Sequence, residues 1–113
     1  MIVRTSEAHI APGRRDEFMA VLVDLVATFQ DRYPGLVSHS ILIDREDADR
    51  VVYQSVWLDE DSVRGFAGDD WANEPVTFPG EQELLLEPLR LRHFQTDADV
   101  VEEEELEDFA PLD

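Results

Sequence analysis

The stretch that decides the fold is "GLVSHSILIDREDADRVVYQSVWL", residues 35–58. It contains two strand-like runs, 35–43 and 50–58, joined by the polar segment "DREDAD". Short runs rich in β-branched and aromatic residues with polar segments between them are typical of strands. We therefore predict an antiparallel hairpin.

The second run of this hairpin carries bulky side chains on both of its faces. Successive side chains of a strand point to opposite faces, which divides the run into two sets. One set contains Tyr53, Ser55 and Trp57, and the other contains Val52, Gln54, Val56 and Leu58. Since both sets include large apolar groups, we expect neither face to be simply solvated.

The segments around the hairpin complete an α+β pattern. Residues 2–10 and 89–96 are strand-like, and apolar residues recur at helical spacing over 14–33. Asp59 or Asp61 can cap a short helix that follows the hairpin. The resulting order is β-α-β-β-α-β, the ferredoxin-like split β-α-β arrangement of an antiparallel sheet with helices on one face. Its other face would be bare, so we predict a homodimer in which a second copy covers it.

Composition restricts the possible functions. The 113 residues suffice for one domain, and the absence of cysteine excludes disulfides, thiolate nucleophiles, Fe–S clusters and zinc knuckles. The net charge of -18 argues against nucleic acid and anionic membranes as partners. No apolar run reaches the ~20 residues that span a bilayer, and no secretory signal is evident, so we expect a cytoplasmic protein.

The charge also predicts the environment in which the chain works. The chain contains 27 acidic residues and only nine basic ones, all of which are arginine. Such mutual repulsion is tolerable where concentrated salt screens it, which favours a halophilic origin over a merely GC-rich genome. The acidic excess culminates in a tail, residues 97–113, punctuated by apolar residues, and we expect this tail to dock on its own subunit or on a neighbour.

Three segments together resemble one known family. They are "APGRRDEFMAVL" after the first strand, "YQSVWLDEDSVRGF" at the end of the hairpin and the late "PLRLRHFQT". They are similar to the antibiotic biosynthesis monooxygenase family of dimeric α+β barrels, over residues 1–96. The most specific feature is Trp57, followed by an acidic turn into a helix that carries Phe66. The resemblance implies a small-molecule ligand and, in several branches of the family, oxygenase or isomerase activity.

The haem-degrading branch of that family matches poorly. Its members use an Asn late in the first strand, a Trp on the second helix and an iron-ligating His further on. With Gly13 aligned to their glycine after the first strand, this chain has Ser6 and Phe66 at the first two positions. No histidine lies between His39 and His93. Haem degradation is therefore the third interpretation, and we predict no cofactor.

The cofactor-independent oxygenases of the family suggest a different site. They deprotonate a phenol and let the carbanion give an electron to oxygen, inside a flat pocket lined by Asn, Tyr, Trp or His. The residues that can supply such a pocket here are Ser6, His39, Tyr53, Trp57, Phe66, Trp71 and Asn73. For Trp57 we favour a role in the core, whereas Trp71 follows an acidic loop and fits a pocket lid, a dimer contact or a satellite core equally well.

The histidines are the best candidates for proton transfer. His9, His39 and His93 lie on three separate segments, which does not match the close spacing of metal ligands, so we predict no metal site. A general base needs no partner at fixed spacing. If the protein is an enzyme, we expect His39, His93 and Tyr53 to be its catalytic residues.

Two classes of function remain open. The first is a small oxygenase or isomerase with a pocket between the sheet and the helices. The second is a non-catalytic dimeric module that binds a ligand or a partner. A roomy cavity lined by aromatic and convergent polar groups would favour the first, and a packed interior would favour the second.

Overall fold

The protein has the predicted β-α-β-β-α-β order of elements. We describe it from a computed structural model of residues 1–97, so the predicted docking of the acidic tail lies outside the described residues. The elements are β1 (Ile2–His9), α1 (Arg15–Val26), α2 (Phe29–Arg32), β2 (Leu36–Ile43), β3 (Arg50–Trp57), α3 (Glu60–Ala67), the 3-10 turn η1 (Glu81–Leu84) and β4 (Arg90–Gln95).

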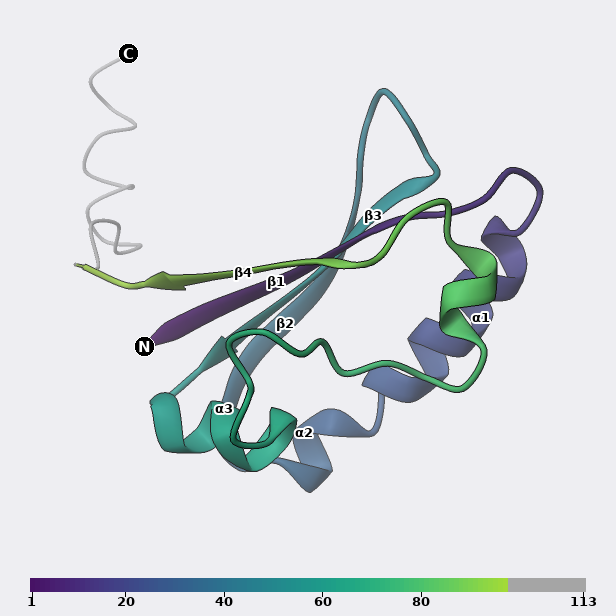
Figure 1. The fold of residues 1–113 in the computed structure, drawn as a ribbon. Coiled ribbons are helices and arrows are strands. Elements are labelled where there is room, and N and C mark those ends of the chain that lie inside the picture. The colour runs from purple at the N-terminus through teal and green to yellow at the C-terminus, as the bar shows by residue number, and fades with distance from the viewer. Residues whose placement is uncertain (98–113) are drawn as a thin grey trace, which may run out of the picture.

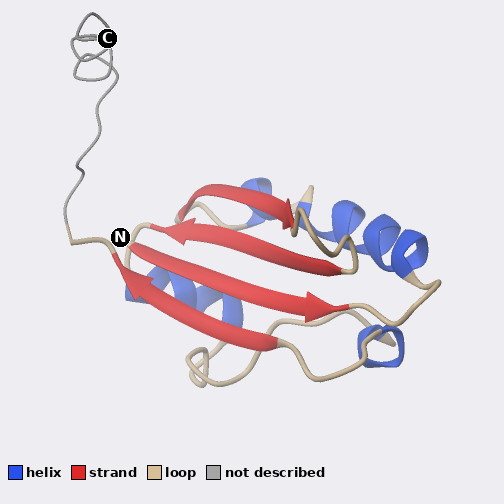
Figure 2. Ribbon diagram, turned by 90° about the horizontal axis from the view of Figure 1, so that it is seen from above, coloured by secondary structure: helices blue, strands red, loops and turns tan. Residues whose placement is uncertain are grey.

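The four strands form one antiparallel sheet in the order β2-β3-β1-β4. The helices all lie on one face of this sheet, and the other face is left open (Figure 1 and Figure 2). This arrangement confirms the predicted ferredoxin-like α+β fold. No helix among residues 1–97 is long and apolar enough to cross a membrane.

The core lies between the sheet and the helices, and Trp57 is at its centre. Trp57 has no exposed surface and stacks on Phe66 of α3, with ring centroids 4.8 Å apart. Its indole Nε1 donates a hydrogen bond to Ser55 Oγ at 2.8 Å, so the one polar atom of the ring is satisfied inside the core. This environment agrees with our interpretation of Trp57 as a core residue.

The helical spacing of apolar residues over 14–33 suggests one helix, but the structure divides this segment into two helices. α1 ends at Val26 and the short α2 begins at Phe29. At the break, the Thr28 hydroxyl donates to the carbonyl of Leu25 at 2.9 Å. Threonine side chains that bond the nearby backbone compete with regular helix geometry. The apolar periodicity continues across the break and therefore cannot reveal it.

α3 is fixed at its first turn by a side-chain cap. Asp59 accepts hydrogen bonds from the backbone N–H of Ser62 at 2.8 Å and from its hydroxyl. Such a cap satisfies donors that the first turn of a helix leaves free. Ser62 also lies against Gly35, just before β2, where a methyl group would overlap the Ser62 side chain. The cap and this close approach together hold α3 beside the β2–β3 hairpin.

The open face of the sheet presents apolar side chains to solvent. Phe94 of β4 is 52% exposed and Leu42 of β2 is 44% exposed. A shallow hollow of about 240 Å³ lies on this face. It is lined by Thr5, Glu7, Val52, Arg90, Arg92 and Phe94. An apolar surface of this kind on a sheet is typical of a surface that another protein covers.

Candidate functional site

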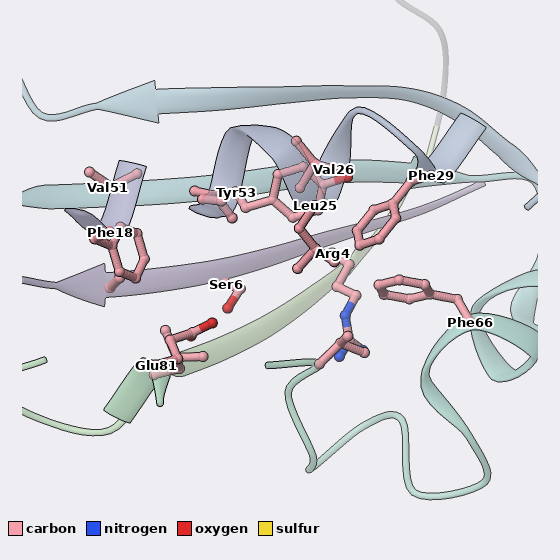
Figure 3. Close-up of a pocket in the computed structure, with 14 residues that line it drawn as sticks. Arg4, Ser6, Phe18, Leu25, Val26, Phe29, Val51, Tyr53, Phe66 and Glu81 are labelled. Atoms are coloured by element: carbon pink, nitrogen blue, oxygen red, sulfur yellow. The ribbon is translucent and has the colours of Figure 1, made fainter. Parts of the chain in front are cut away.

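A small cavity lies between the helix-facing side of the sheet and the helices (Figure 3). Its volume is about 40 Å³, room for roughly three water molecules and far less than the ~300 Å³ of a typical small-molecule pocket. Its walls are largely apolar. The lining residues are Arg4, Ser6, Ala8, Phe18, Leu22, Leu25, Val26, Phe29, Val51, Tyr53, Phe66, Val76, Glu81 and Leu89.

Strand alternation places the polar lining residues. Arg4, Ser6 and Ala8 share the helix-facing side of β1, and Ser6 is the register partner of Tyr53 on β3. Each of these side chains therefore points from the sheet toward the helices. α1 and α2 supply the apolar wall opposite, and the segment before β4 supplies Val76 and Leu89.

Tyr53 and His39 form a hydrogen-bonded pair beside the cavity. The Tyr53 hydroxyl oxygen lies 2.7 Å from His39 Nδ1, and the two rings meet edge to face. Burial raises the pKa of Tyr53 well above its ordinary value, so the phenol is neutral at physiological pH. His39 is half-buried on the edge strand β2. The pair therefore connects the hydroxyl of a cavity-lining tyrosine to an imidazole on the outermost strand.

Arg4 is the one cationic side chain that lines the cavity, and it is only 3% exposed. Its Nη1 donates to the carbonyl of Trp71 at 2.7 Å and its Nη2 to the carbonyl of Glu74 at 3.1 Å. Nη1 also lies 2.9 Å from Nε2 of His93. Because guanidinium is only a donor, His93 must accept this hydrogen bond through an unprotonated Nε2. Burial lowers the pKa of Arg4 to about 10, so it stays charged at neutral pH.

Glu81 is a second buried polar group of the cavity. It belongs to η1, and one of its carboxyl oxygens accepts from the backbone N–H of Phe78 at 3.2 Å. Burial raises the pKa of its carboxyl above the ordinary value, and the hydrogen bond from Phe78 opposes that shift only in part. Figure 3 shows Glu81 toward Ser6 and away from Arg4. The two buried ionisable groups thus occupy different parts of the cavity.

The structure brings some of the predicted site residues to this cavity. Ser6, Tyr53 and Phe66 line it. His39 reaches it only through Tyr53, and His93 only through Arg4. The predicted catalytic histidines therefore lie behind the lining residues.

The other predicted pocket residues lie elsewhere. Trp57 is enclosed in the core, and the exposed Asn73 donates to Asp70 at 2.8 Å. The half-buried Trp71 packs its ring edge to face against His93, with centroids 4.8 Å apart. Its contribution to the site is its backbone carbonyl, which holds Arg4. None of the three side chains is among those that line the cavity.

Arg4 and Glu81 were missed by reasoning from the sequence. A signal for Arg4 does exist, since it shares the inward face of β1 with Ile2, Ser6 and Ala8. A charged residue on the apolar side of a strand is rare and indicates a candidate functional residue. For Glu81 no comparable signal exists, because it opens the short 3-10 turn η1 in an acidic stretch whose sequence has no strand alternation.

The lining of the cavity includes groups that can transfer a proton, and among the described residues it includes no histidine that could ligate a metal or a haem iron. Among residues 1–97, no three His, Cys, Asp or Glu side chains are placed to bind a metal ion. Neither His39 nor His93 lines the cavity, so no imidazole is presented to a ligand inside it. A neutral phenol backed by an imidazole and a buried cation can instead remove a proton from a bound molecule and stabilise the anion.

Comparisons with known proteins agree with this fold. Residues 1–70 match the model of the antibiotic biosynthesis monooxygenase family. No curated protein matches the chain.

Solved structures similar to this chain include two that cover most of it. A conserved protein from Methanosarcina mazei aligns with a TM-score of 0.71 and 19% identity, over 85% of this chain and 92% of its own. A variant of SnoaB, a cofactor-independent oxygenase from Streptomyces nogalater, aligns with a TM-score of 0.67 and 22% identity, over 89% of this chain and 97% of its own. At these identities the likeness shows a shared fold.

Proposed function

Since the chain belongs to the antibiotic biosynthesis monooxygenase family, we propose that it is a cofactor-independent oxygenase or isomerase acting on a small aromatic or electron-rich molecule. The substrate would bind in the cavity between the sheet and the helices. The observation that carries this proposal is the 2.7 Å hydrogen bond between Tyr53, which lines the cavity, and His39 behind it. The likeness to SnoaB, itself a cofactor-independent oxygenase, supports the oxygenase form.

In the proposed reaction, Tyr53 and His39 act as a proton relay. With its Nδ1 unprotonated, His39 accepts from the Tyr53 hydroxyl, which leaves the Tyr53 oxygen free to accept from a substrate hydroxyl. As the substrate proton passes to Tyr53, the Tyr53 proton passes to His39. Tyr53 stays neutral throughout, in keeping with its raised pKa, and ends as a hydrogen-bond donor to the new anion. The half-buried His39 then returns the proton to solvent.

In the oxygenase form, the deprotonated substrate reacts with molecular oxygen. The carbanion form of a phenolate gives an electron to O₂, and the two radicals combine at a ring carbon. Loss of the ring hydrogen and cleavage of the O–O bond leave one oxygen atom in a quinone and release the other as water. The balance is one phenol and one O₂ giving one quinone and one water. In the isomerase form, the relay takes the proton from the substrate hydroxyl and returns it to a ring or chain carbon of the resulting anion, which converts the hydroxyl compound into its carbonyl tautomer.

The volume of the cavity limits the substrate and favours a second candidate function. About 40 Å³ does not admit a polycyclic ring system, and even a single ring must displace a side chain. Val76, in the irregular segment after α3, is the exposed part of the wall and is the side chain best placed to move. A non-catalytic module that binds a small ligand remains the second candidate, because the interior is this nearly packed. Haem fits neither the volume nor the lining side chains.

We propose further that the protein is a homodimer formed through the open faces of two sheets. Association would remove the exposed side chains of Leu42 and Phe94 from water. Burial of apolar surface stabilises the complex by ~25 cal/mol for each Å² covered. The hollow on this face carries Glu7 as well as Arg90 and Arg92. In a two-fold dimer the same surface of each subunit contacts the other. A surface that carries both acidic and basic side chains can therefore pair opposite charges across the interface.

The experiment that tests the proposed activity uses a panel of monocyclic phenols and hydroquinones in air. Oxygen consumption and quinone absorbance are followed with the wild-type protein, Tyr53→Phe and Tyr33→Phe. Tyr33 is the matched control, since it is the other tyrosine and does not line the cavity. We expect wild type and Tyr33→Phe to oxidise at least one compound and Tyr53→Phe to be slower by about 100-fold, the typical contribution of a general acid or base.

The same panel separates the two candidate functions. A compound that binds saturably and is neither oxidised nor isomerised, as judged by oxygen uptake and by NMR of the mixture, would support the binding module. Equal rates for Tyr53→Phe and Tyr33→Phe would show that the reaction does not use the relay.

A further inference from the structure

Arg4 is a buried cation without a carboxylate partner in residues 1–97. Every ion pair that an arginine makes in this part of the chain belongs to Arg14, Arg50 or Arg64, whose side chains are 39–43% exposed. The whole chain has three acidic residues for each basic one. In so acidic a protein, an arginine that is nearly enclosed and still unpaired with a carboxylate requires an explanation, because buried charges are normally paired.

The hydrogen bonds of Arg4 use only part of its guanidinium. Nη1 contacts the carbonyl of Trp71 and His93 Nε2, and Nη2 donates to the carbonyl of Glu74. Guanidinium has five N–H donors. One N–H of Nη2 and the N–H of Nε therefore have no hydrogen-bond partner within residues 1–97. Nε and Nη2 flank the same edge of the guanidinium plane, and two free N–H groups on that edge would match the two oxygens of a carboxylate.

The surroundings of Arg4 specify the rest of such a ligand. Its Cζ lies 5.8 Å from the centroid of the Phe66 ring, and Phe66 packs edge to face on Phe29 at 5.1 Å. All three residues line the cavity, and Figure 3 shows Phe66 and Phe29 beside the Arg4 side chain. A ligand held at Arg4 thus meets aromatic rings. Its charged group faces a cation and its body faces an apolar wall.

We propose that Arg4 binds the carboxylate of a small aromatic acid, so that the molecule which this cavity accepts is an anion. The inference rests on the proposed function, in that it takes the cavity as the substrate site, and it adds the chemical class of the substrate. The carboxylate supplies the counter-charge that residues 1–97 do not provide. Because about 40 Å³ does not hold a ring, a wall side chain such as Val76 must first move aside. The aromatic ring then lies against Phe66 and Phe29, within the space that Tyr53 also lines.

A purely structural role for Arg4 is the alternative. Through Trp71 and Glu74, Arg4 ties the segment after α3 to β1. That role accounts for two of the hydrogen bonds, and it requires neither a net positive charge nor the unused edge. The two accounts differ in one measurable respect, because only the ligand-binding role makes the affinity depend on the charge of the ligand.

The test compares benzoate with benzamide, which have the same ring and nearly the same shape but differ in charge. Binding to the full-length wild-type protein is measured by calorimetry and by the ligand-induced rise in melting temperature. Both ligands are measured at the same KCl concentration. We expect benzoate to bind at least about tenfold more tightly than benzamide, as for a charge-assisted bidentate pair. Equal affinities, or no benzoate binding, would overturn the proposal.

Variants assign the preference to Arg4. Arg4→Met keeps the length and apolar stem of the side chain and should abolish the preference for benzoate, while Arg4→Lys keeps the charge and should retain part of it. Arg64→Met, on the exposed side of α3, is the matched control and should bind as wild type does. A preference that survives in Arg4→Met contradicts the proposal. If Arg4→Met does not fold, the wild-type comparison still decides, and since no turnover is needed, a missing catalytic activity leaves this result unaffected.

Discussion

Arg4 on β1 and His93 on β4 are register partners in the sheet, and Nη1 of Arg4 lies 2.9 Å from Nε2 of His93. The imidazole accepts from a cation, so it holds Arg4 only while it is unprotonated. Burial, and then the charge of Arg4, lower the pKa of His93 below the ordinary histidine value of 6.5. The position of the cavity cation therefore depends on a group whose pKa lies below that of an ordinary histidine.

This relationship predicts a stability that declines on mild acidification. Because the pKa of His93 is lower in the folded protein than in the unfolded chain, the unfolded chain takes up a proton first. The contribution of His93 is fully present above about pH 6.5 and is lost as the pH falls from there through the folded-state pKa. Urea unfolding at closely spaced pH values between 8 and 5 would measure the decline.

His93→Gln is the control for that titration, since glutamine can accept from Arg4 at every pH. We expect its unfolding free energy to vary less over the same interval than that of wild type. An identical pH dependence for the two proteins would show that groups other than His93 cause the decline.

Gly35 predicts a steric effect on the attachment of α3. A methyl group at this position would overlap the Cβ and Oγ of Ser62, whose own hydrogen bonds complete the cap of α3. Gly35→Ala should lower the free energy of unfolding by about 1–3 kcal/mol, the usual cost of overpacking. Thermal or urea unfolding of the wild type and of Gly35→Ala measures this difference in unfolding free energy.

Gly65, inside α3, is the matched control for Gly35. A methyl group there would meet nothing within 4 Å, and alanine favours helix over glycine by up to ~1 kcal/mol. Gly65→Ala should therefore be neutral or stabilising. If Gly35→Ala is as harmless as Gly65→Ala, the close approach of Gly35 and Ser62 is not what fixes α3.

The sheet was largely predictable from the sequence, whereas the site was not. Runs rich in β-branched and aromatic residues located β2 and β3 within one residue, because the polar segment between them marks where each run ends. The site depends on contacts that no local pattern records. Arg4 donates to the backbone carbonyls of Trp71 and Glu74, which are 67 and 70 positions further along the chain, in an irregular segment. The pairing of His39 with Tyr53 becomes evident only once the hairpin register is known.

The open face of the sheet predicts how the oligomer can be broken. Phe94→Glu places a carboxylate on that face, where the two-fold symmetry of the proposed dimer would bring it near its own copy in an already acidic protein. We expect the mass measured by light scattering to fall from that of a dimer to that of a monomer. Val23→Glu, at an exposed apolar position of α1, should leave the dimer intact. A wild-type monomer, or dissociation by Val23→Glu alone, would refute an interface on the open face.

The net charge of -18 predicts a dependence of folding on salt. In molar KCl the screening length is ~3 Å, which suppresses repulsion among carboxylates on the surface. Removing the salt by dialysis should therefore lower the melting temperature and, at low ionic strength, reduce the circular dichroism of helix and sheet. Unchanged dichroism and melting temperature after dialysis would contradict the halophilic interpretation.

The central claim is that the cavity takes a proton from a bound phenol, and the absorbance of a chromophoric phenol tests it most directly. The phenol is mixed with excess protein one pH unit below its own solution pKa, with wild type, Tyr53→Phe and Tyr33→Phe in parallel. The account predicts that the phenolate band grows with wild type and Tyr33→Phe, and that it grows much less with Tyr53→Phe. A phenol that binds saturably to wild type and stays neutral, or one that ionises equally with all three proteins, would contradict it.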